Sequence, residues 1–99
     1  MIPRELMPRF TPKITRRVYG GVQHIFEFEN GYGASVIQHE YSYGGKRDLW
    51  ELAVLKNDDY FEHPLTESGG GVLGFLKWDG EAKVTVEKLL EQIEALSIE

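Results

Sequence analysis

The chain has 99 residues and a net charge of −5; 41% of its residues are hydrophobic, 12% are aromatic and none is cysteine. This length and apolar content suit one globular domain with a single modest core and exclude intrinsic disorder. The lack of cysteine excludes disulfides, thiolate metal ligands and thiol nucleophiles. Residues 1–8 lack the continuous apolar run of a secretory signal and no segment is long enough to span a membrane, so we expect a cytoplasmic protein without membrane contact.

The N-terminal residues combine prolines with positive charge. Pro3, Pro8 and Pro12 disfavour a regular helix, so we expect residues 1–12 to form an extended arm ahead of a single α+β domain at residues 13–99. Five basic residues against one acid give residues 1–17 a charge of +4: Arg4, Arg9, Lys13, Arg16 and Arg17. Residues 57–99 carry a charge of −7 instead. The two ends could attract each other within the chain or across a dimer, although simple solvation of the charges explains the pattern as well.

The first half of the chain predicts three strands. Residues 13–19 and 22–29 read as strands joined by a turn at Gly20-Gly21, and apolar residues alternate along the second of them. Asn30-Gly31 predicts a two-residue type I′ turn into a third strand, with Tyr32 at the end of the sheet. This turn would pair Phe28 with Gly33 and Phe26 with Ser35, so that rings lie over small residues, and would set His24 and His39 on one face.

The second half of the chain predicts one more strand and a helix. Residues 48–56, after a loop at Gly44-Gly45, are apolar on both strand faces, which indicates a central strand. Residues 57–80 contain Pro64 and three consecutive glycines, so we expect irregular structure there. Apolar residues repeat with helical spacing over residues 85–96, behind Thr85 as N-cap. The predicted fold is therefore α+β, an antiparallel β-meander of three to four strands packed against one C-terminal amphipathic helix.

No motif for catalysis or for a cofactor stands out. His24, His39 and His63 could hold zinc if they converged, but their spacing matches no zinc motif. The acids at positions 58, 59, 62 and 67 lack the alternating order of a calcium loop, and Glu62 beside His63 offers only an isolated acid–base pair. We therefore expect a non-enzymatic protein with no catalytic residues, no metal and no cofactor.

Tyrosines near the predicted turns are the best candidates for a binding surface, because their rings contribute large contact area at little cost in rotamer entropy. The predicted binding set joins three of these tyrosines to two neighbouring cations: Tyr32, Tyr41, Tyr43, Lys46 and Arg47. An equal alternative is that the rings only cover the edge of a small core. The basic N-terminal set could contact nucleic acid, but the negative net charge argues against this partner. The acidic helix face could instead mimic a phosphate backbone in a basic groove.

Turn glycines, strand apolar residues and helix apolar residues at positions 30–37, 49–55, 71–76 and 86–96 resemble small uncharacterised proteins encoded by bacteriophages. The resemblance carries over no site residue. It implies an accessory protein that acts in the host cytoplasm by binding a host or phage macromolecule. Such binding could inhibit a host defence or a nucleic-acid enzyme. The alternatives are a structural protein that self-associates through its N-terminal arm, and a nucleic-acid-binding protein.

Overall fold

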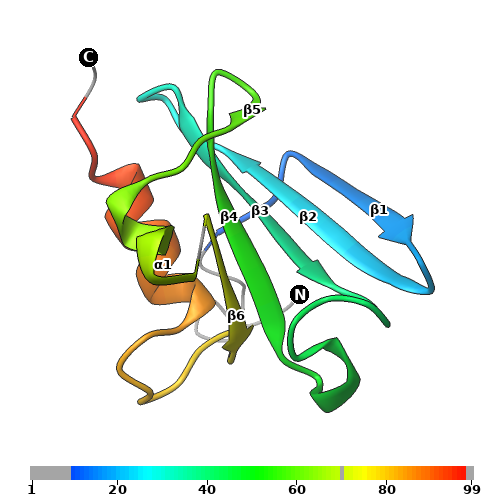
Figure 1. Cartoon of the computed structure of the whole chain (residues 1–99). Coiled ribbons are helices and arrows are strands. Elements are labelled where there is room, and N and C mark those ends of the chain that lie inside the picture. Colours follow the sequence, from blue (N-terminus) through cyan, green and yellow to red (C-terminus); the bar gives the residue numbers. More distant parts are fainter. Residues whose placement is uncertain (1–9, 70, 98–99) are drawn as a thin grey trace, which may run out of the picture.

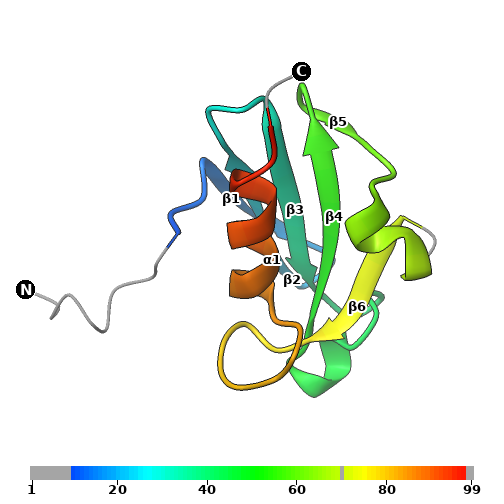
Figure 2. The same cartoon turned by 90° about the vertical axis from the view of Figure 1, so that its left-hand side faces the viewer.

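An antiparallel sheet of six strands and one α-helix make up the fold, over residues 10–69 and 71–97, which are the residues that the computed structural model describes. The elements follow the order β1 (Ile14–Val18), β2 (Gly21–Glu27), β3 (Tyr32–Gln38), 3-10 helix η2 (Gly45–Arg47), β4 (Trp50–Lys56), β5 (Asp59–Tyr60), 3-10 helix η3 (Pro64–Gly69), β6 (Val72–Leu76) and α1 (Val86–Glu94). Figure 1 shows the sheet with α1 beside it, and Figure 2 shows that α1 covers one face. The fold is therefore α+β, as predicted.

The sheet has more strands than the predicted three to four. Strands β1 to β4 form a meander in chain order, and both β5 and β6 pair with β4. These two additional strands come from residues 57–80, which the sequence predicted to be irregular. The apolar side chains of Leu73 and Leu76 reach the core from β6, and pairing with β4 satisfies the backbone groups of this segment. Strand β4 is central, as its two apolar faces indicated.

The β2–β3 hairpin differs from the predicted register by one residue. The amide of Gly31 donates to the carbonyl oxygen of Phe28 at 3.2 Å. The amide of Phe28 donates to the carbonyl oxygen of Tyr32 at 2.9 Å. Gly31 has φ +85, so the loop is a three-residue turn closed by a left-handed glycine instead of a two-residue type I′ turn. Phe26 consequently pairs with Ala34, and Ser35 pairs with Ile25 on the opposite face.

The β1–β2 hairpin turns at Tyr19-Gly20, one residue earlier than predicted. Val18 pairs with Gly21, and the two residues between them have φ values of +46 and +78. Positive φ at both central positions is typical of a type I′ turn, which usually holds asparagine and glycine. A tyrosine in the first of these positions is therefore an unusual choice.

The core lies between α1 and the face of the sheet that it covers. Its largest fully buried apolar side chains come from three strands and the helix: Phe26, Val36, Leu52, Val54, Val86, Leu90 and Ile93. Thr85 is the N-cap, as predicted, because its hydroxyl accepts a hydrogen bond from the amide of Lys88 at 3.2 Å. Phe10 also joins this core, with its ring edge against Phe28. Residues 1–9 of the predicted arm lie outside the described residues.

The C-terminal end of α1 is held by the side chain of Asn30. Its Nδ2 lies 2.9, 3.1 and 3.0 Å from the carbonyl oxygens of Ile93, Glu94 and Leu96, while its Oδ1 accepts from the amide of Tyr32 at 3.0 Å. The last carbonyls of a helix have no partner within it, so a donor from elsewhere is valuable there. The turn residue thus links the hairpin to the helix end across more than 60 positions of sequence.

Candidate functional site

Four exposed aromatic rings, in two contacting pairs, lie at the end of the sheet where β1 turns into β2, β3 ends, β4 begins and β6 ends. They belong to Tyr19, Tyr41, Tyr43 and Phe75, which are 73%, 75%, 60% and 57% exposed. We call these four residues the aromatic end. Three separate segments supply them: the β1–β2 turn, the loop after β3 and strand β6. Large apolar side chains with this exposure are uncommon as a cluster, so the aromatic end is the candidate binding site.

Tyr19 and Tyr41 form the first half of the aromatic end. Their ring centroids lie 5.8 Å apart, edge to face, and the ring of His39 lies 5.3 Å from Tyr19 and 6.3 Å from Tyr41. The loop is fixed locally, because His39 Nδ1 accepts from the amide of Tyr41 at 3.0 Å and Ser42 Oγ donates to the carbonyl oxygen of His39 at 3.0 Å. The three rings therefore stand in a defined arrangement, although Tyr19 and Tyr41 are exposed and His39 is half-buried.

Tyr43 and Phe75 form the second half. Their rings stack with centroids 6.3 Å apart, and the amide of Phe75 donates to the carbonyl oxygen of Tyr43 at 3.1 Å. Strand β6 bulges at this point: Trp50 pairs with Leu76 and Leu52 with Leu73, so two residues of β6 oppose one of β4. A Cβ atom on Gly74 would lie 2.4 Å from Cβ of Tyr43, so only glycine allows this close approach.

Two of the four rings stand on left-handed backbone. Tyr19 has φ +46 and Phe75 has φ +57. A bulky L-residue in this region costs roughly 1–2 kcal/mol relative to glycine or asparagine. The chain accepts that cost at one residue of each ring pair, and both side chains are exposed instead of filling the core.

The structure places the predicted binding residues in two different regions. Tyr41 and Tyr43 lie in the aromatic end, and Lys46 and Arg47 are exposed in η2 of the same loop. Tyr32 does not join them: it is 6% exposed, at the opposite end of the sheet, in contact with Phe61 and His63. The expectation of an exposed Tyr32 was wrong because the register shift by one residue turns its ring onto the helix-covered face.

The predicted basic set is not a continuous patch where it can be described. Lys13 pairs with Glu27, and this hydrogen-bonded ion pair raises the pKa of the lysine and lowers that of the glutamate. Arg16 donates from Nε to Gln23 Oε1 at 2.7 Å, and Arg17 is exposed near the Tyr19 turn. Arg4 and Arg9 lie outside the described residues. Within that described part, two of the three cations are therefore engaged with neighbours on β2.

The three histidines do not converge. With the corrected register, His24 and His39 no longer share a face, and His63 lies at the other end of the sheet beside Tyr32. His24 packs against Trp50 and Trp78, and burial lowers its pKa. Residues 10–69 and 71–97 contain no group of three or more histidine, aspartate or glutamate side chains placed to hold a metal ion.

The predicted binding set left out Tyr19, although it is one of the tyrosines near the predicted turns, and it left out Phe75. The Gly20-Gly21 pair beside Tyr19 predicted a turn. It did not predict that Tyr19 itself takes a positive φ within that turn. Phe75 lies in the segment predicted to be irregular, and as a large apolar residue it was expected to be buried. The bulge that turns it outward depends on the pairing of β6 with β4.

No family model matches the chain, and the searches of curated proteins and of solved structures also found no match. Among the helices in the described part of the chain, none is long and apolar enough to cross a membrane.

Proposed function

We propose that this chain is a non-enzymatic binding protein that engages a protein partner through its aromatic end. The observation that carries the proposal is the set of four exposed rings, held in fixed positions by the sheet and by the loop after β3. Tyrosine is enriched where proteins make their strongest contacts, because it combines a large apolar ring with a hydroxyl. The side chains of this surface offer contact area and hydrogen bonds.

The energy available from such contacts is sufficient for specific binding. Each exposed ring could remove roughly 100–150 Å² from water, which corresponds to about 3 kcal/mol before the costs of association. The ring pairs are already in contact with each other, so little side-chain entropy remains to be lost when a partner binds.

The backbone strain supports the same proposal. Glycine or asparagine at position 19 would suit the turn better than tyrosine, and glycine at position 75 would suit the bulge better than phenylalanine. A residue that costs stability where it stands, and whose ring adds nothing to the core, is best explained by a role in binding.

Protein is a better candidate partner than nucleic acid. The cations near the aromatic end, Arg17, Lys46 and Arg47, are accompanied by acids such as Glu40 and Asp48. A phosphate backbone requires an excess of positive charge over the contacting surface. In keeping with the resemblance to phage-encoded proteins, we propose an accessory role in the cytoplasm of a bacterial host, with a host or phage protein as the partner.

The test compares two tyrosine variants at opposite ends of the sheet. The double variant Tyr41→Ser, Tyr43→Ser removes half of the aromatic end, and Tyr60→Ser removes a tyrosine of similar exposure, 71%, from β5. Affinity capture from bacterial lysate should recover the same protein with the wild-type chain and with Tyr60→Ser, and at least tenfold less with the double variant. Equal recovery with all three chains, or no enriched protein, would contradict the proposal.

Two further measurements separate the alternatives. Light scattering of the wild-type chain and the double variant tests whether the aromatic end binds a second copy, since a mass that falls only in the double variant would show self-association. Binding to single-stranded nucleic acid that weakens steeply with salt would show instead that the rings stack on bases.

A further inference from the structure

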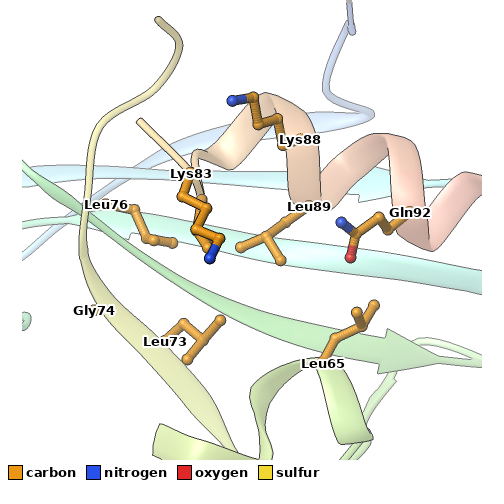
Figure 3. A pocket seen from close by; sticks show the side chains of 9 residues that line it. Leu65, Leu73, Gly74, Leu76, Lys83, Lys88, Leu89 and Gln92 are labelled. Carbon is orange, nitrogen blue, oxygen red and sulfur yellow. The ribbon is translucent and has the colours of Figure 1, made fainter. Parts of the chain in front are cut away.

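A second surface feature is a pocket between α1, β6 and η3, which meets the aromatic end at Gly74. Its volume is about 330 Å³, and Figure 3 shows it from close by. The apolar walls come from Leu65 of η3, Leu73 and Leu76 of β6, Leu89 of α1, and Val84 just before α1. Leu76 and Leu89 are buried members of the core, and Leu65 and Leu73 pack against it. The floor of the pocket is therefore the outer layer of a packed core and has a stable shape.

The size of the pocket sets the size of a ligand. An apolar cavity of about 150 Å³ holds one benzene molecule, so about 330 Å³ accommodates roughly twice as many heavy atoms. That volume also lies at the lower end of the range for small-molecule sites, about 300–1,000 Å³. It is too small for a helix or a strand, and it fits a compact molecule with an apolar body.

The polar groups of the pocket define the charge of a ligand. Two lysines, Lys83 and Lys88, line the pocket, and no lining residue is acidic. Lys88 donates from Nζ to the carbonyl oxygen of Ala82, and Figure 3 shows its amine directed away from the leucines. The amine of Lys83 instead lies over the space between Leu76 and Leu89, and it has no hydrogen-bond or ion-pair partner in the described part of the chain.

This local charge contrasts with its surroundings. Residues 57–99 carry a net charge of −7, yet the pocket that they form presents only cations. No histidine, aspartate or glutamate lines the pocket to bind a metal ion, and a multiply charged phosphate would find one unengaged ammonium group. A single carboxylate on an apolar body complements both the Lys83 amine and the leucine walls, and the carboxamide of Gln92 adds a hydrogen-bonding group.

We propose that this pocket binds a small amphipathic carboxylate, with its apolar body against Leu65, Leu73, Leu76 and Leu89 and its carboxylate paired with Lys83. A medium-chain fatty acid has this chemistry, and octanoate is the probe for the test. For a ligand of this size we expect a dissociation constant on the order of 0.1–1 mM. The site is independent of the aromatic end, so either proposal can fail without the other.

The experiment is a titration of the labelled full chain with octanoate, followed by amide chemical shifts. Saturable shifts should concentrate at residues of α1, β6 and η3 that line the pocket. Octanol, which has the same tail and no charge, and acetate, which has the charge and no tail, should each bind at least fivefold more weakly. Shifts that do not saturate, that spread over the surface, or that are equal for octanoate and octanol would overturn the proposal.

A matched pair of variants tests the role of Lys83. Lys83→Met keeps the length of the side chain and removes the charge, and Lys77→Met makes the same change at an exposed lysine that does not line the pocket. Octanoate binding should weaken about fivefold in the first variant and stay unchanged in the second. Both lysines are exposed, so neither substitution should disturb the core, and thermal melts check that both variants fold. Equal affinity of the two variants would exclude the carboxylate–Lys83 pair.

Discussion

Replacement of Asn30 by aspartate should destabilise the protein more than replacement by alanine, although aspartate has the same shape. The Asn30 amide group donates to carbonyl oxygens at the end of α1, and its Oδ1 accepts from the amide of Tyr32. Asn30→Ala loses both interactions. Asn30→Asp keeps the acceptor for Tyr32 but turns the donor into a charged acceptor that faces carbonyl oxygens.

The magnitudes follow from the number of bonds and from the helix dipole. The two hydrogens of the Asn30 amide group are shared among three carbonyl oxygens, so each hydrogen bond is weaker than a single one. Their loss in Asn30→Ala therefore costs about 1–2 kcal/mol of unfolding free energy. A carboxylate at the negative end of the helix adds about 0.3–1 kcal/mol of repulsion, so Asn30→Asp should cost about 2–3 kcal/mol. The order of stability at neutral pH is therefore wild type, then Asn30→Ala, then Asn30→Asp.

Urea unfolding followed by the fluorescence of Trp50 and Trp78 measures these differences. A loss of about 2 kcal/mol lowers the midpoint by roughly 1–2 M urea for a chain of this size. Asn57→Asp is the matched control, because Asn57 also lies in a turn with positive φ, 51°, but does not cap the helix; it should change stability by less than about 0.5 kcal/mol. If Asn30→Asp is as stable as wild type, or more stable than Asn30→Ala, the capping argument is wrong.

The acid dependence of Asn30→Asp provides an independent check. The negative helix end should raise the pKa of the new carboxyl group in the folded state above its unfolded value of about 3.9. A protonated carboxyl group can donate to the helix carbonyls, so this variant should recover stability relative to wild type below about pH 4. The recovered stability should be lost again as the pH rises through the folded pKa. A deficit that is constant between acid and neutral pH would refute the electrostatic part of the argument.

Three further predictions concern other residues. Tyr19→Asn should raise the unfolding free energy by about 1 kcal/mol in urea melts, because asparagine accepts the left-handed turn, and should weaken partner capture; unchanged or lower stability contradicts the strain at Tyr19. Burial lowers the pKa of His24 in the folded chain, so as the pH falls His24 is protonated in the unfolded chain before it is protonated in the folded chain. Stability should fall as the pH drops from about 7 through 6.5 to the folded pKa, and His24→Gln should remove this component of the urea-midpoint profile. Thr85→Ala removes the N-cap acceptor and should cost about 1 kcal/mol, whereas Thr85→Ser should cost less.

The helix and the central strand could be predicted because their signals are local. The helical repeat of apolar residues and the Thr85 cap act within a few residues, and they identified α1 with its N-terminal boundary. Apolar residues on both faces of residues 48–56 predicted a central strand, and β4 is central. Each of these features is decided by neighbours in sequence.

Distant residues decide the hairpin register, strands β5 and β6, and the contacts of Tyr19 and Phe75 with the predicted Tyr41 and Tyr43, so these features could not be predicted. Asn30 and Gly31 suit both a two-residue and a three-residue loop. In the three-residue loop that forms, Asn30 donates to the carbonyl oxygens at the end of α1, a contact between residues far apart in sequence. Strand β6 is interrupted by a bulge that hides its alternation, so its apolar residues read as irregular chain. Phe75 and Tyr43 meet only because that bulge pairs against β4.

The capped helix end has a consequence for the order in which the chain can fold. Strands β1 to β4 are joined by turns and one loop, so they can pair as soon as they exist. The face that holds Val36, Leu52 and Val54, however, is covered by α1, the last element in sequence. Until the helix docks and Asn30 meets its carbonyls, a paired sheet would expose that apolar face to water. During synthesis, this half-assembled sheet is therefore the species most exposed to aggregation, and the helix that completes the fold also protects it.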